Sequence, residues 1–305
     1  MKVCFICTKP LQIMISMIIS EQFADADLVL VDDFEGVHEI LLSEDLRRYF
    51  KNVSISRSRQ AAIIEMAGRD YTRVFIDSDV GLHTHLALFL CKLRSPALKF
   101  SVYEEGIGTY RNDLVTGIAK GLLYRFLGAG RYFGASAFVS EIYCFQPARY
   151  VAVFPRNGRS VRGIDTCFVD WLFANQRKLL RIFPGLEEFS LSGTERIFLY
   201  LTNWELNPTV IESLGLNGNL LVKPHPHLKY DVVKNATFRL PDITLVPGGV
   251  PAEVLIVYLL GFTNELFVLH SGSSVAHYLG SMKSVNFIDI RSKWNVNLDN
   301  LGISL

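Results

Sequence analysis

The sequence carries little charge, and what it carries is balanced. Charged residues make up 20% of the 305 residues, with 31 lysines and arginines against 30 aspartates and glutamates. The resulting net charge of +1 gives no general electrostatic reason to bind nucleic acid. Half of the residues are hydrophobic and the mean hydropathy is +0.24, which excludes an intrinsically disordered chain.

Long hydrophobic runs are missing as well. A transmembrane helix needs ~20 mostly apolar residues, whereas the best internal run, Val254–Phe262, is much shorter. The start of the chain superficially resembles a signal peptide, but Thr8, Lys9 and Pro10 interrupt it and no small-residue cleavage site follows. We expect no membrane span, and we interpret the first twenty residues as a buried strand, a turn and a helix.

Cysteines are few and odd in number. Cys4 and Cys7 form a C-x-x-C pattern, but side chains on a strand alternate between faces, so a redox pair is not expected. This usage predicts a reduced, cytoplasmic compartment. The five cysteines are Cys4, Cys7, Cys91, Cys144 and Cys167.

Three common nucleotide and hydrolase signatures are also absent. No G-x-G-x-x-G follows the first predicted strand, and the sequence has no G-x-x-x-x-G-K-[ST]. Nor does it have the G-x-S-x-G of a nucleophile elbow. Dinucleotide-binding, P-loop and α/β-hydrolase interpretations therefore have no support.

What the sequence does contain is an alternation of short apolar strands with helical patterns. Continuous apolar strands separated by helices predict parallel sheets covered on both faces. The expected strands are 2–7, 28–31, 73–76, 99–103, 142–144, 196–201, 219–222, 243–246, 266–269 and 285–288. The expected helices include 11–23, 81–93, 168–182, 208–213 and 273–280.

The repetition of this pattern predicts an α/β protein of two Rossmann-like, doubly wound domains. The polar stretch Pro155–Gly163 suggests a boundary, so we place the domains at 1–158 and 159–305. Ligands of such sheets bind beyond the carboxyl ends of strands, and the cleft between two such domains is the expected active site. Polar residues directly after strands are therefore the candidates.

The strongest candidate group is Lys223-Pro224-His225-Pro226-His227, which follows the strand at 219–222. The prolines stiffen the loop, and a basic residue with a histidine suits the binding and protonation of a phosphate leaving group. The alternative is a solvated turn with incidental histidines. A single histidine would favour that alternative, whereas the whole group after a strand favours a functional site.

Two further groups follow downstream. Glu253, in Pro251-Ala252-Glu253, stands in the first turn of an apolar helix, where it satisfies the helix dipole or accepts hydrogen bonds from ribose hydroxyls. Ser271-Gly272-Ser273-Ser274 lies between a strand and a helix. This geometry cradles phosphates, although a serine there can also be an ordinary N-cap.

Acidic residues follow several other strands. Glu104 and Glu105, before Gly106, provide a candidate general base or a charged turn, and Glu205 comes soon after the strand at 196–201. Asp77-Ser78-Asp79, with His83 and His85 nearby, resembles the D-x-D that holds a divalent cation in metal-dependent sugar-nucleotide transferases. Because this motif is short and often caps a helix, we expect no metal.

Taken in order, these motifs resemble bacterial sialyltransferases, most closely glycosyltransferase family 52, which includes lipooligosaccharide α-2,3-sialyltransferases. The landmarks extend from residue 8 to residue 274. They are Thr8-Lys9-Pro10-Leu11-Gln12, Glu104-Glu105-Gly106, Lys223-Pro224-His225-Pro226, Pro251-Ala252-Glu253 and Ser271-Gly272-Ser273-Ser274.

The resemblance implies a GT-B fold and an inverting, metal-independent transfer of sialic acid from CMP-sialic acid to a terminal galactose, with no cofactor. It implies that His225 is the general acid and Glu253 the ribose ligand. Lys223, Pro226, Ser271, Gly272, Ser273 and Ser274 would complete the donor site, the three serines at the phosphate, with Glu104 and Gly106 on the acceptor side. It favours Glu205 as the base, with Glu105 close behind.

Other functions stay open. The same fold serves transferases of other donors, sugar-nucleotide isomerases or hydrolases, and carbohydrate-binding proteins without activity. Gly117–Phe133 mixes Lys120, Arg125 and Arg131 with leucines and aromatics, which is typical of a peripheral contact with the inner face of a bacterial inner membrane. A core-packing helix pair with solvated arginines is an equal alternative for this segment. A homodimer is a separate open expectation for the whole chain.

Overall fold

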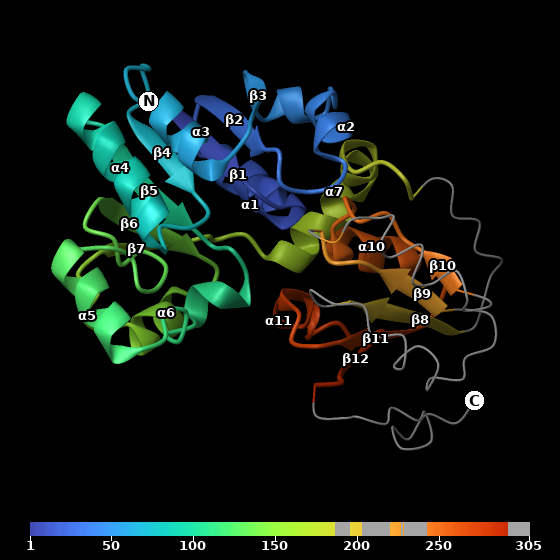
Figure 1. Ribbon diagram of the computed structural model, residues 1–305. Coiled ribbons are helices and arrows are strands. Elements are labelled where there is room, and N and C mark those ends of the chain that lie inside the picture. The colour runs from blue at the N-terminus through green and yellow to red at the C-terminus, as the bar shows by residue number, and fades with distance from the viewer. Residues whose placement is uncertain (187–195, 203–219, 227, 229–242, 292–305) are drawn as a thin grey trace. The chain divides into compact units, whose positions relative to one another are not determined.

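The computed structural model describes residues 1–186, 196–202, 220–226, 228 and 243–291. It divides the chain into two units (Figure 1). Unit 1 comprises 1–33 and 41–167, and unit 2 comprises 34–40 and 168–305. Each unit is built on one parallel sheet, so the predicted α/β fold with two Rossmann-like sheets is confirmed.

The sheet of unit 1 has seven parallel strands in the order β3-β2-β1-β4-β5-β6-β7. The chain adds strands to one side of β1 and then returns to β4 on its other side, as in doubly wound sheets. The strands are β1 Lys2–Cys7, β2 Asp25–Val31, β3 Val53–Ser56, β4 Arg73–Ile76, β5 Lys99–Tyr103, β6 Val139–Cys144 and β7 Ser160–Gly163.

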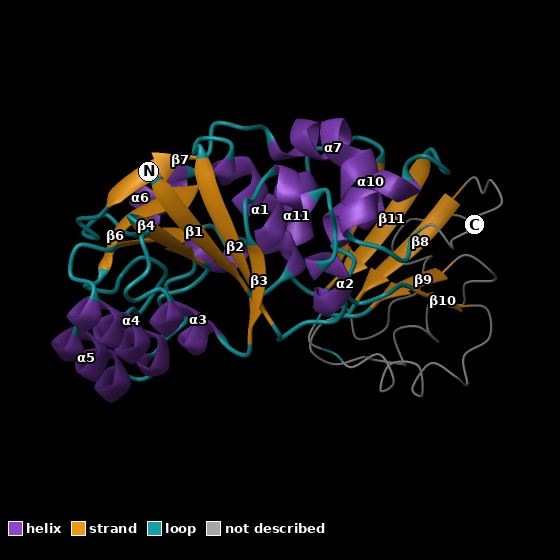
Figure 2. Cartoon of the chain, turned by 90° about the horizontal axis from the view of Figure 1, so that it is seen from above, coloured by secondary structure: helices purple, strands orange, loops and turns teal. Residues whose placement is uncertain are grey.

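Helices cover both faces of this sheet because its central strands are apolar throughout. One face packs against α3 and α4 through residues such as Ile63 and Leu88, and Figure 2 shows α3, α4 and α5 gathered on one side. On the other face, the rings of Phe5 and Phe75 stack with centroids 4.5 Å apart. The helices are α1 Pro10–Ser20, α3 Arg59–Glu65, α4 Leu82–Arg94, α5 Ile118–Leu127 and α6 Pro147–Val153, with 3₁₀ turns η1 Leu46–Arg48 and η2 Ile107–Tyr110.

The sheet of unit 2 has five parallel strands in the order β10-β9-β8-β11-β12. Helices α7, α10 and α11 contact one another within this unit. A short helix from the first half of the chain, α2 Val37–Leu41, starts in the segment assigned to unit 2. The strands are β8 Arg196–Leu201, β9 Leu220–Lys223, β10 Ile243–Leu245, β11 Glu265–His270 and β12 Val285–Asp289; the helices are α7 Phe168–Ile182, α10 Ala252–Leu259 and α11 Ser274–Leu279.

The structure differs from the expectations in three places. Strands β3 and β7 were not expected. Because β7 pairs with β6, unit 1 continues to Cys167, nine residues beyond the expected boundary at 158. Residues 34–40 belong to unit 2, although the expected division places them in the first domain. The expected helix at 208–213 lies outside the described residues.

Two other expectations concern the membrane and the cysteines. Within the described ranges, no helix combines the length and the apolar character needed to cross a bilayer. Cys4 and Cys7 are both buried and unbridged. Burial raises the pKa of the Cys7 thiol to about 12 and that of Cys4 further still, so neither forms a reactive thiolate at neutral pH.

Candidate functional site

Each sheet has a point where the strand order reverses, and open α/β sheets bind ligands there. In unit 2 the reversal lies between β8 and β11. The carboxyl end of β8 leads to Thr202, that of neighbouring β9 to His225, and that of β11 to the serine turn at 271–274. The predicted donor-binding groups thus share one edge of one sheet.

The loop after β9 is fixed at both of its ends. The backbone N–H of His225 donates to Thr202 Oγ1 at 2.9 Å. Lys223 is buried, and its Nζ donates to the carbonyls of Pro224 and Gly248, each at 2.8 Å. His225 therefore stands on a loop held by β8 on one side and by the 248 loop on the other, with Pro226 in the turn that follows.

Lys223 sits in a cluster of buried charge rather than in solvent. Burial lowers the pKa of its ammonium to about 8, against the opposing effect of the carboxylates of Glu253 and Glu35. Burial also raises the pKa of Glu253 to about 7. The hydrogen bonds of Lys223 join the loop after β9 to the loop at Gly248. Its expected direct contact with the donor stays a prediction.

Glu35 reaches this cluster from the segment at 34–40. Its Oε2 accepts a hydrogen bond from the N–H of Gly248 at 3.2 Å. A Cβ on Gly249 would lie 2.5 Å from the Glu35 carbonyl oxygen and 3.3 Å from the Gly36 Cα. The two backbones therefore pack directly on each other, and only glycine fits at Gly249.

Some of the hydrogen-bonding groups of the serine turn already have partners within the chain. His270 Nδ1 accepts from the N–H groups of Gly272 and Ser273 at 3.1 and 3.3 Å, so its ring proton lies on Nε2. Burial lowers the pKa of His270, in keeping with a neutral ring. Ser273 caps α11, with its Oγ accepting from the N–H of Val275 at 3.3 Å.

A cation that the sequence reasoning missed lies against this turn. Gly272 has a φ of +80°, and a Cβ there would stand 2.9 Å from an Arg291 Nη1. Arg291 pairs with Asp289 at the end of β12, and this hydrogen bond raises the pKa of Arg291. The turn therefore combines the hydroxyls of its serines with a neighbouring guanidinium, as an anion site requires.

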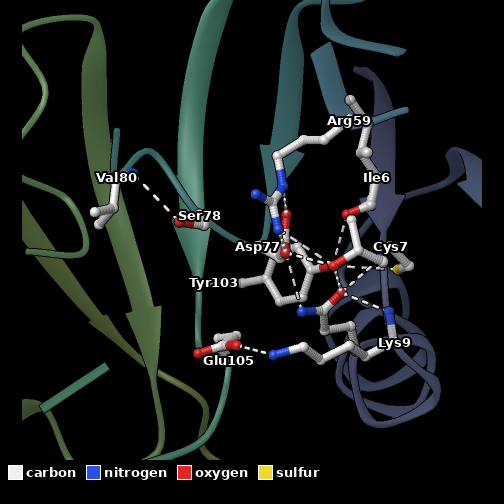
Figure 3. Close-up of polar contacts among 11 residues, drawn as sticks. Ile6, Cys7, Lys9, Arg59, Asp77, Ser78, Val80, Tyr103 and Glu105 are labelled. Carbon is white, nitrogen blue, oxygen red and sulfur yellow. Dashed lines mark hydrogen bonds and ion pairs between the residues drawn. The ribbon is translucent and has the colours of Figure 1, made fainter. Parts of the chain in front are cut away.

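In unit 1 the strand order reverses between β1 and β4, and side chains of the chain fill that point (Figure 3). Asp77 is fully buried and accepts from Thr8 Oγ1 at 2.8 Å, from Gln12 Nε2 at 3.1 Å and from Arg59 Nε at 2.8 Å. Gln12 Oε1 in turn accepts from the N–H of Thr8 and of Lys9. The Asp77 network thereby fixes the loop after β1.

The two aspartates of the D-x-D pattern thus have separate structural partners. Asp79 accepts from the N–H groups of Gly134 and Ser136, each at 2.7 Å. Burial raises its pKa to about 6 despite these bonds. Within the described residues, no group of three or more histidines, cysteines and acids could hold a metal ion.

The two glutamates after β5 have different environments. Glu104 is fully buried and accepts hydrogen bonds from the Tyr110 hydroxyl and from the N–H of Phe145. These bonds stabilise the fold around the end of β5. Glu105 is partly exposed and forms an ion pair with Lys9, as Figure 3 shows. Gly106, with a φ of +120°, turns the chain after them.

Comparison with known proteins adds nothing to this geometry. No model of a known protein family matches the chain, and no curated protein matches it. The functional assignment therefore depends on the residues themselves.

The predicted site residues divide into three sets. The structure brings His225, the serine turn and Glu253 to unit 2, and it places Glu104, Glu105 and Gly106 in unit 1. Glu205 and His227 lie outside the described residues. Sequence reasoning missed Arg59, Glu35, Thr202 and Arg291; only Thr202, directly after an expected strand, carried a local signal.

A recess of about 610 Å³ lies elsewhere, at the amino end of β2, where Arg47 and Lys51 contribute to its wall. Ligands of parallel sheets bind at the opposite, carboxyl ends of the strands. The recess is therefore not part of the candidate site.

Proposed function

We propose that the chain is an inverting sialyltransferase that moves sialic acid from CMP-sialic acid to a terminal galactose of a lipooligosaccharide or related glycan, with an α-2,3 linkage. The observation that carries the proposal is the convergence of Thr202, His225 and the serine turn at the strand-order reversal of unit 2. The resemblance of the ordered motifs to family 52 supplies the identity of the donor.

The chemistry of this donor suits the residues. Sialic acid leaves from a tertiary anomeric carbon that already bears a carboxylate, so positive charge develops on the sugar and negative charge on the departing phosphate. In the proposal, the bond from the anomeric carbon to the phosphate oxygen breaks, and the His225 imidazolium gives that oxygen its proton. Ser271, Ser274 and Arg291 stabilise the phosphate charge.

The acceptor hydroxyl forms the new bond from the opposite face, which inverts the configuration. Its proton passes to a carboxylate, a contribution of ~10²–10⁴ in rate. Glu205 is the favoured base, and Glu105, which forms an ion pair with Lys9, is the alternative.

Donor binding is tested first, by thermal unfolding with CMP or UDP. At a hundredfold excess over Kd, a ligand of the native state adds ~2.7 kcal/mol to the free energy of unfolding. We expect CMP to raise Tm by several degrees and UDP to leave it unchanged. Equal stabilisation by UDP would indicate another donor.

The role of His225 is tested by kinetics. We expect His225→Ala to lower kcat by ~10²–10⁴ with little change in the donor KM. The control is His83→Ala, which alters an exposed histidine in unit 1. Loss of donor binding with turnover preserved would contradict the acid role, and donor hydrolysis without transfer to any acceptor would favour a hydrolase.

A further inference from the structure

The outer faces of α4 and α5 expose an unusual amount of apolar surface. Nine of the thirteen exposed large hydrophobic side chains among the described residues lie on these two helices. Phe126 and Ile118 are 88% and 86% exposed. The set is Leu86, Phe89, Leu90 and Leu93 on α4, and Ile118, Leu122, Leu123, Phe126 and Leu127 on α5; we call it the α4–α5 surface.

The spacing shows that these residues form ordered stripes. On α4, the exposed positions follow i, i+3, i+4 and i+7, while Thr84, Ala87, Leu88 and Cys91 are buried on the opposite side. On α5, the same alternation leaves Gly121 and Tyr124 buried. A helix that is apolar on its buried face needs no second apolar face for folding, so the outer stripes call for another explanation.

The two helices lie close together in unit 1. Val80, just before α4, forms an isolated parallel β-bridge with Gly130, just after α5. The Gly81 N–H before α4 donates to the carbonyl of Gly130, just after α5, at 3.4 Å. The ring centroid of Phe138 lies 4.9 Å from that of His85 and 6.1 Å from that of Phe89, both on α4. The neighbouring Ala137 N–H donates to the carbonyl of Gly128, the C-cap residue of α5, at 2.8 Å. The start of α4 and the end of α5 therefore adjoin, and both helices lie on the same side of the unit 1 sheet (Figure 2).

The charged residues on these two helices, and directly after α5, have one sign. Neither 82–94 nor 118–131 contains an aspartate or a glutamate. Arg94, Lys120, Arg125 and Arg131 are all exposed there. A second copy of the chain in a two-fold arrangement would bring these cations against one another, whereas an anionic surface would neutralise them.

We propose that the α4–α5 surface binds anionic lipid bilayers peripherally. The leucines and phenylalanines enter the boundary between headgroups and acyl chains, and the arginines and Lys120 contact the anionic headgroups. Unit 1 thereby rests on the membrane without spanning it. The inference is independent of the proposed transferase activity, because it needs only the exposed residues of two helices.

The apolar part of the proposal is tested by flotation of the full chain with vesicles of phosphatidylcholine, pure or mixed with phosphatidylglycerol. We expect flotation with the mixed vesicles only. The variant Leu122→Ser/Phe126→Ser should lower this partitioning at least ~tenfold. Its control is Leu42→Ser/Val151→Ser, which alters two exposed hydrophobic side chains of unit 1, one directly after α2 and one on α6. This control should bind the vesicles as the natural chain does.

The charge requirement has its own pair of variants. Lys120→Glu/Arg125→Glu should also lower partitioning at least ~tenfold, because each basic residue near an anionic leaflet contributes about 1 kcal/mol. Arg47→Glu/Arg57→Glu makes the same change of net charge elsewhere on unit 1 and should have little effect. Equal flotation with neutral vesicles, or unchanged binding of either α5 variant, would overturn the proposal.

Sedimentation velocity separates the lipid from a second copy. We expect a monomer for both the natural chain and Leu122→Ser/Phe126→Ser in the absence of vesicles. A dimer of the natural chain that dissociates in this variant would show that the α4–α5 surface binds another copy, and would overturn the assignment to lipid.

Discussion

The Asp77 network allows a sharp prediction because the structure gives its hydrogen-bond partners among the described residues. Asp77 is fully buried, whereas the Arg59 side chain is 25% exposed and covers it. Replacing Arg59 by leucine removes the counter-charge and two N–H donors. Among the described residues, Thr8 and Gln12 then remain as the hydrogen-bond donors to the buried carboxylate. Breaking a buried pair in this way costs about 3–5 kcal/mol. We expect Arg59→Leu to lower the free energy of unfolding of unit 1 by this amount.

A double-mutant cycle separates the loss of the pair from the loss of packing. Asp77→Asn removes the charge that needs Arg59, so the double variant Arg59→Leu/Asp77→Asn should be more stable than the sum of the single effects by ~2 kcal/mol. Urea unfolding at neutral pH measures each variant. Arg57→Leu, at an exposed arginine two positions away, should change stability by at most ~0.5 kcal/mol. Additive effects of the two single substitutions would refute the pairing.

Two further predictions concern Glu253 and Gly249 of unit 2, and Gly121 of unit 1 is the control for the second. Burial raises the folded-state pKa of Glu253 to about 7 from an ordinary 4.5. The contribution of this carboxyl group to the free energy of unfolding is therefore fully present below pH 4.5 and is lost as pH rises through 7. Glu253→Gln should remove this decline, measured by urea unfolding between pH 4.5 and 7.5. Gly249→Ala should lower the free energy of unfolding by ~1–3 kcal/mol, because its Cβ would lie 2.5 Å from the Glu35 carbonyl oxygen. In Gly121→Ala the nearest atoms to the new Cβ belong to the flexible Arg131 side chain, so this variant should be neutral or stabilising. Thermal unfolding compares the two.

Most strands could be predicted from the sequence because buried parallel strands are continuous apolar runs. The two strands that escaped prediction are the edges of the first sheet. In β3, Val-Ser-Ile-Ser alternates polar and apolar residues, and β7, Ser-Val-Arg-Gly, has one apolar residue. Edge strands are open on one side, so their sequences need little apolar mass, and the signal is correspondingly weak.

From the sequence, only the site residues that directly follow predicted strands could be identified. His225 and the serine turn follow strands, and the parallel topology alone brings them to one edge. Their partners could not be found in this way. Arg59 meets Asp77 from a helix after an unexpected strand, and Glu35 meets Gly248 across 213 positions of the chain. Contacts of this kind depend on the tertiary fold, which local sequence patterns do not encode.

The two strand-order reversals explain why the donor is assigned to unit 2. At the reversal in unit 1, Arg59 and Asp77 neutralise each other and their hydrogen bonds are taken up by neighbouring side chains. An anion there would have to displace Asp77 from its own guanidinium, at a cost of several kcal/mol. At the reversal in unit 2, His225 and the serine turn follow the strand ends, and the exposed Arg291 forms a solvent-exposed ion pair with Asp289. An incoming phosphate there exchanges water for hydrogen-bond donors without first breaking a buried ion pair. The same parallel topology thus gives one reversal that is closed by internal structure and one that suits an anionic ligand.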